Sequence, residues 1–106
     1  MNAEQQKKCK RILDHYGAAN QRLQLIEECA ELIQAINKYN RAIGSITTGY
    51  YPDVIKAEND IGREIADVLI MIEQISTALF KDDRSFIDEV IEYKLNRQLQ
   101  RMRDEK

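Results

Sequence analysis

The chain has 106 residues, of which 43% are hydrophobic and 32% charged, with a single Pro and four Gly. This length suits one domain with one modest core, and so few Pro and Gly residues argue against a many-stranded β fold. A net charge of −2 argues against a nucleic-acid scaffold, and no run approaches the ~20 apolar residues of a membrane span. We therefore expect one helical domain over residues 1–106, with neither a nucleic-acid nor a membrane partner.

The beginning of the chain and its cysteines predict the compartment. The segment MNAEQQKKCK is polar and lacks the apolar centre of a signal peptide. Cys9 and Cys29 have no metal-binding or redox spacing, so we interpret them as reduced thiols of a cytoplasmic protein.

Apolar periodicity and turn residues divide the chain into four predicted helices, at residues 3–16, 20–42, 53–80 and 85–103. Gly17 is a plausible stop for the first helix, and Gly44 closes the second. The segment 44–52 contains two glycines and the only proline, which predicts a long loop. Pro52 fits the first turn of the third helix.

The second and third predicted helices are apolar over more than half of their circumference. Packing on one side against the other helices of a single chain does not require so much apolar surface. We therefore expect a second copy of the chain to cover the remainder, in a homodimer or a homotetramer.

Within the second predicted helix, the stretch LQLIEECAELIQAI places a carboxylate where an apolar residue is expected. At about 100° per residue, apolar side chains from Leu25 to Tyr39 gather on one arc. Glu28 falls inside this arc, between Ala35 and Tyr39, and Glu31 lies at its edge.

The third predicted helix repeats this pattern in the stretch GREIADVLIMIEQI. Glu64 lies between Met71 and Ile75 on the apolar arc, and Asp67 lies at its margin. Isolated carboxylate pairs with this spacing are common on solvated helix faces. Two such pairs on the apolar arcs of the two most hydrophobic helices favour a metal-binding site. If these helices pack antiparallel, the four carboxylates meet between them.

Four carboxylates in a shared buried volume repel one another or take up protons unless a cation neutralises them. All of the ligands are hard oxygens, with no His or Cys at ligand spacing, which favours Mg²⁺ or Mn²⁺ over Zn²⁺. Di-iron bundles use Glu-x-x-His pairs, which this sequence lacks. The single histidine, His15, is interpreted as a helix-end residue.

Two motifs carry a resemblance to a known family. The string QRLQLIEECAEL, followed by REIADVL, resembles the MazG-like branch of the all-α nucleoside triphosphate pyrophosphohydrolases over residues 16–101. The resemblance implies an all-α four-helix bundle in which acidic residues of two central helices face the core, completed by dimerisation. It also implies hydrolysis of a nucleoside triphosphate between its α and β phosphates, giving a monophosphate and pyrophosphate in nucleotide-pool housekeeping.

The resemblance also implies roles for individual acidic residues and for one glutamine. The expected Mg²⁺ ligands are Glu28, Glu31, Glu64 and Asp67. Glu27 occupies the first Glu of the motif and has an expected catalytic role, either completing a further metal site or orienting the attacking water. Gln21 matches a frequent Gln of the family and is expected to touch the nucleotide.

The fourth predicted helix has the expected cationic residues. Lys94 lies between the apolar positions Val90 and Ile91 around the helix, on its inward face, where it could reach the phosphates and assist catalysis. The family often has a Lys and a later Arg here, which indicates Lys94 and Arg101. For Arg97, substrate binding and a solvated position are equally supported.

The sequence leaves the nucleobase and the reaction partly open. Candidate contacts to the base are Tyr16, Asn40, Tyr50 and Tyr51, although Tyr16 also suits a core position. A related alternative function is that of a phosphoribosyl-ATP pyrophosphohydrolase. An alternative of another class is a non-catalytic helical dimerisation module.

Overall fold

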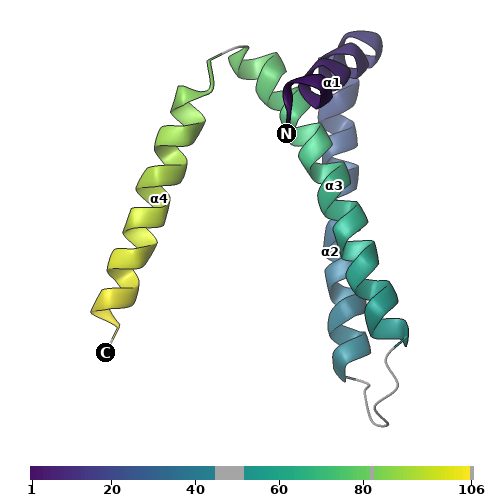
Figure 1. Ribbon diagram of the computed structural model, residues 1–106, viewed down its shortest axis with the longest axis vertical. Helices are drawn as coiled ribbons and strands as arrows, with labels where there is room; N and C mark the ends of the chain where they lie inside the picture. Colours follow the sequence, from purple (N-terminus) through teal and green to yellow (C-terminus); the bar gives the residue numbers. More distant parts are fainter. Residues whose placement is uncertain (45–51, 82, 106) are drawn as a thin grey trace.

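A computed structural model describes residues 1–44, 52–81 and 83–105. Over these residues the chain forms α1 (Ala3–Tyr16), α2 (Ala18–Gly44), α3 (Pro52–Phe80) and α4 (Ser85–Asp104), with no strand (Figure 1). The predicted all-α class is confirmed, and each helix begins and ends within two residues of its predicted limits. Most of the predicted loop, with Tyr50 and Tyr51, lies outside the described residues.

Local hydrogen bonds fix both ends of α1. The Asn2 side chain accepts a hydrogen bond from the backbone N–H of Gln5, and the Gln5 side chain accepts one from that of Asn2, at 2.8 and 2.9 Å. This reciprocal pair satisfies two N–H groups that a helix start leaves without partners. At the other end Gly17 has φ 87°, which glycine adopts without a Cβ clash, and its N–H donates to the Leu13 carbonyl. The predicted stop at Gly17 is confirmed.

The antiparallel pair of α2 and α3 is the body of the molecule, and α1 crosses one end of it (Figure 1). All three helices contribute buried apolar side chains, which are Cys9, Leu13, Ala35, Ala57, Val68 and Met71. Two glutamines also lie in this interior. Gln21 Nε2 donates to Gln74 Oε1 at 2.8 Å, so that each buried amide has a partner across the α2–α3 contact.

A buried ion pair joins the end of α3 to the turn that follows it. Arg84 donates from both terminal nitrogens to the Glu73 carboxylate, with Nη2 to Oε1 at 2.9 Å. Its Nη2 also donates to Thr77 Oγ1 at 2.7 Å, and that hydroxyl donates to the Glu73 carbonyl. Hydrogen bonding from Arg84 holds the pKa of Glu73 below its ordinary value, so the carboxylate stays ionised.

Helix α4 stands apart from the other three helices (Figure 1). Its only ring contact with α3 is at their junction, where the rings of Phe80 and Phe86 stack with centroids 6.3 Å apart. Beyond this junction its apolar side chains are exposed, among them Ile91, Leu95 and Leu99. A helix with an apolar stripe is stable when that stripe is covered, so α4 lacks its partner within one chain. None of the helices described is long and apolar enough to cross a membrane.

The buried glutamine pair gives a direct test of the α2–α3 packing. Gln74→Ala should lower the free energy of unfolding by about 1–3 kcal/mol, because it leaves the buried Gln21 amide without its partner. Urea denaturation measures this change. Gln100→Ala, at an exposed position of α4, is the control. A change in Gln74→Ala below about 0.5 kcal/mol would contradict the role of this pair.

Candidate metal centre

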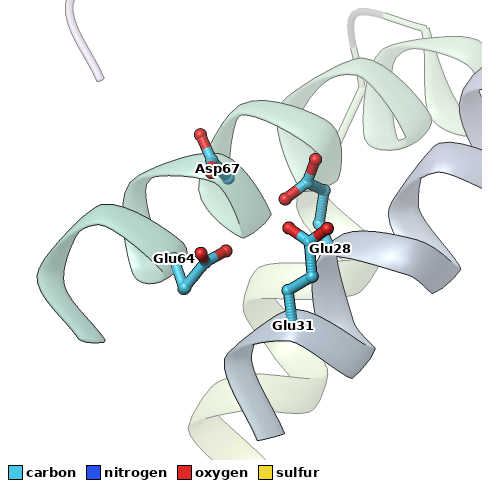
Figure 2. A group of neighbouring side chains, drawn as sticks. All are labelled: Glu28, Glu31, Glu64 and Asp67. Atoms are coloured by element: carbon cyan, nitrogen blue, oxygen red, sulfur yellow. The ribbon is translucent and has the colours of Figure 1, made fainter. Parts of the chain in front are cut away.

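Four carboxylates gather between α2 and α3, and we call them the carboxylate cluster: Glu28 and Glu31 from α2, and Glu64 and Asp67 from α3 (Figure 2). One carboxylate oxygen from each residue lies within 4.8 Å of the corresponding oxygens of the other three. Each pair is three residues apart and therefore shares one face of its helix. The antiparallel packing turns these two faces toward each other, and the expected convergence is confirmed.

The cluster is enclosed on one side and open on the other. Glu28 and Glu64 are partly buried, whereas Glu31 and Asp67 are exposed. Glu28 Oε2 and Glu64 Oε2 are each buried without a hydrogen-bond partner. A buried carboxylate oxygen without a partner is costly, so both atoms indicate a place for a cation.

The mutual repulsion of these carboxylates affects the titration of Glu31. The charge of Glu28 is the largest cause that raises the pKa of Glu31 above its ordinary value, and Glu64 contributes further. Like charges at this spacing favour the protonated form of one member. A bound cation would favour the ionised form of the same group.

Gln24 orients one member of the cluster and was missed by sequence reasoning. Its Nε2 donates to Glu28 Oε1 at 2.8 Å, which leaves Glu28 Oε2 directed to the other carboxylates. Hydrogen bonds of this kind fix the orientation of metal-binding side chains. The signal available in the sequence was the spacing of four residues between Gln24 and Glu28 on one helical face.

A hollow of about 340 Å³ adjoins the cluster, lined by Glu31, Gln34, Ala35, Lys38, Ala57, Asp60 and Glu64, and we call it the acidic hollow. The two small buried alanines leave room for it between the helices. Asp60 forms ion pairs with Lys56 and Arg63. Lys38 forms no ion pair with the described residues, and it is the only cationic side chain in this lining. Lys38 follows Glu31 by seven residues, two helical turns, a spacing that could have identified it.

The other residues expected at the site are not part of the cluster. Gln21 is buried and bonded to Gln74, and a contact with the nucleotide would require it to leave this bond. Glu27 is exposed on α2, outside the cluster. Their predicted roles stay predictions.

The three cationic residues expected to bind phosphates, Lys94, Arg97 and Arg101, lie exposed on α4. Beyond the Phe80–Phe86 contact at its start, α4 does not pack against the other helices, so a single chain does not bring these residues to the carboxylate cluster. The guanidinium of Arg97 lies over the Tyr93 ring, 5.8 Å from its centroid. The sequence showed which face of this helix is apolar, but not that this face stays uncovered within one chain.

The donor set of the cluster fits a hard divalent cation. Four carboxylates supply only oxygen atoms, and Mg²⁺ and Mn²⁺ prefer such ligands. Two of these oxygens are buried without a hydrogen bond, which a cation would satisfy. Such a cation could also hold the phosphates of a substrate.

The protein is therefore an all-α protein with a candidate metal centre, formed by four carboxylates of its central antiparallel helix pair. The family model of the MazG nucleotide pyrophosphohydrolase domain matches residues 18–104, and the chain belongs to this family. The matched residues contain α2, α3 and α4 with the whole cluster. Comparisons with curated proteins and with solved structures found no match.

The raised pKa of Glu31 predicts how pH affects the metal-free protein. The folded chain holds this proton more tightly than the unfolded chain. Protonated Glu31 therefore contributes to stability when the pH is below its ordinary pKa of 4.5. This contribution is lost as the pH rises through the raised pKa of the folded protein. In EDTA at neutral pH, Glu31→Gln should melt at a higher temperature than the unmodified protein, and this advantage should disappear in acid.

Thermal unfolding followed by circular dichroism over a pH series measures this difference. Glu58→Gln, at an exposed position of α3 outside the cluster, is the matched control and should show no such pH-dependent gain. Equal melting temperatures for Glu31→Gln and the unmodified protein at neutral pH would contradict repulsion within the cluster.

Proposed function

We propose that this protein is a Mg²⁺-dependent nucleoside triphosphate pyrophosphohydrolase, with Mn²⁺ as a possible substitute, that removes unwanted nucleotides in the cytoplasm. The reaction cleaves between the α and β phosphates and yields a nucleoside monophosphate and pyrophosphate. Membership of the MazG family supports the reaction class. The observation that carries the proposal is the convergence of four carboxylates, one oxygen from each. Glu28 and Glu64 each have in addition a buried oxygen without a hydrogen bond.

The carboxylate cluster would hold the metal through Glu28, Glu31, Glu64 and Asp67. When bound, Mg²⁺ supplies charge neutralisation for the triphosphate and lowers the pKa of a water molecule. Gln24 keeps Glu28 oriented toward the other members. The helices are rigid supports, which suits phosphoryl transfer because this chemistry depends on positioning and electrostatics.

The acidic hollow offers space for the substrate next to the cluster. Lys38 is placed to contact a negatively charged group of a substrate that extends from the cluster into this hollow. Glu27, at the first Glu of the motif, either binds a further metal ion or orients the attacking water.

The metal requirement is tested by pyrophosphate release from a panel of canonical, deoxy and modified nucleoside triphosphates. Release should require Mg²⁺, and Glu28→Gln or Glu64→Gln should reduce it about 100-fold or more, since each removes a charged ligand. Glu58→Gln is the control and should retain full activity. Circular dichroism should show the same helicity in these variants as in the unmodified protein, because the fold does not depend on the substituted carboxylates. Full turnover by either cluster variant would exclude the metal assignment.

We also propose that the working enzyme is a homodimer, or a dimer of dimers, in which α4 of one copy lies over another copy. Three observations support this arrangement. The apolar stripe of α4 is uncovered, and so are apolar side chains of α2 and α3, such as Ile33 and Leu69. The basic side chains of α4 are complementary in charge to the carboxylate cluster. Within one chain they do not meet, so Lys94, Arg97 and Arg101 would serve a partner's site.

Subunit mixing tests this arrangement. Glu64→Gln and Lys94→Met should each be weakly active alone, since the first damages the cluster and the second the phosphate contact. After subunit exchange, half of the dimers are mixed, and each mixed dimer has one intact site. The mixture should therefore regain about a quarter of the full rate of pyrophosphate release.

A mixture of Glu64→Gln with Glu28→Gln is the matched control. Both substitutions damage the cluster of their own chain, so mixed dimers have no intact site and should recover no activity. If the Glu64→Gln and Lys94→Met mixture is no more active than its components, Lys94 does not act across the interface.

A further inference from the structure

A second and larger hollow lies between α1 and the end of α3, away from the carboxylate cluster. It measures about 650 Å³, a volume in the range of small-molecule sites, roughly 300–1,000 Å³. We call it the basic hollow, and it is lined by Ala3, Gln6, Lys7, Lys10, Arg11, Glu73, Thr77, Lys81 and Arg84. It shares no lining residue with the acidic hollow.

Among the described residues, the lining of the basic hollow has five cationic side chains and one carboxylate, although the whole chain has a net charge of −2. Three of these cations lie on one face of α1, because Lys10 and Arg11 follow Lys7 by three and four residues. Lys81 and Arg84 come from the turn between α3 and α4. The hollow is therefore a concentrated positive region with cations on both walls.

Glu73, the one carboxylate among the described lining residues, does not neutralise the lysines. Glu73 is engaged by Arg84 through both oxygens, and this pairing lowers its pKa. Lys7, Arg11 and Lys81 form no ion pair with the described residues. Lys10 pairs only with the exposed Asp14, a contact that contributes little to stability and is easily exchanged.

Lys81 has an unfavourable backbone conformation for its residue type. It is the only residue other than glycine with positive φ in the described part of the chain, at 54°, and its N–H donates to the Thr77 carbonyl at the end of α3. Glycine is the usual residue at such a helix end because it has no Cβ. A lysine here places a positive charge at the hollow at the cost of backbone strain.

We propose that the basic hollow binds a polyphosphate anion, such as inorganic pyrophosphate, without a metal and independently of the carboxylate cluster. Several cations spread over two walls suit an anion with several charged groups. No aromatic side chain on which a base could stack is found among the lining residues that the structure describes, which favours the phosphate chain over a nucleobase. The inference does not rest on the proposed reaction, because binding requires no turnover.

Titration calorimetry with inorganic pyrophosphate, in EDTA at low ionic strength, tests the proposal. The unmodified protein should bind one pyrophosphate per chain, at least fivefold more tightly than orthophosphate. The double substitution Lys7→Gln with Arg11→Gln should weaken binding tenfold or more. Glu64→Gln should bind as well as the unmodified protein, which separates this site from the cluster.

Two further variants sharpen the test. Lys8→Gln with Arg22→Gln removes the same charge from exposed positions outside the basic hollow and should change the affinity less than twofold. Lys81→Gly should raise the melting temperature, because it relieves the backbone, while weakening pyrophosphate binding severalfold.

Several results would overturn the proposal. One is the absence of binding in EDTA. Others are equal weakening by the two double substitutions, loss of binding in Glu64→Gln, equal affinity for orthophosphate, and a Lys81→Gly variant that binds normally.

Discussion

Electrostatic repulsion among four carboxylates that share one small volume is the constraint on which the rest of the structure depends. The packing of α2 against α3 holds these groups together, although the chain gains nothing from their proximity in the absence of a cation. The raised pKa of Glu31 and the buried oxygens of Glu28 and Glu64 are the consequences. Such repulsion lowers the stability of the metal-free protein, and a bound cation would relieve it.

The surrounding contacts keep the two helices in register despite this repulsion. The buried Gln21–Gln74 hydrogen bond joins α2 to α3 on one side of the cluster, and the small side chains of Ala35 and Ala57 are buried on the other. Helix α1 covers only one end of the pair. Much apolar surface of α2, α3 and α4 stays exposed, so a second copy of the chain is the simplest cover for it.

The sequence predicted the helices and the cluster because both follow from helical periodicity. A carboxylate at an apolar position, as at Glu28 and Glu64, is visible within one helix, and the antiparallel order of two helices then brings the pairs together. The family motifs pointed to the same residues. The position of α4 could not be predicted in this way, because an apolar stripe indicates that a helix is more stable when covered without showing what covers it.

Other contacts between segments far apart in the sequence lay beyond prediction. The basic hollow combines α1 with the turn after α3, and no local pattern relates Lys7 to Lys81. Lys38 was missed for another reason, since a lysine on an amphipathic helix is usually solvated. The spacing from Glu31 places Lys38 on the same helical face, and α3 then closes the other wall of the acidic hollow opposite it.

The most direct test of the central claim is a crystal structure of the protein with Mn²⁺, examined by anomalous diffraction. We predict a strong anomalous peak within coordination distance of carboxylate oxygens from both α2 and α3, between the two pairs of the cluster. A fully occupied peak elsewhere, or no peak among these four side chains at saturating Mn²⁺, would contradict it.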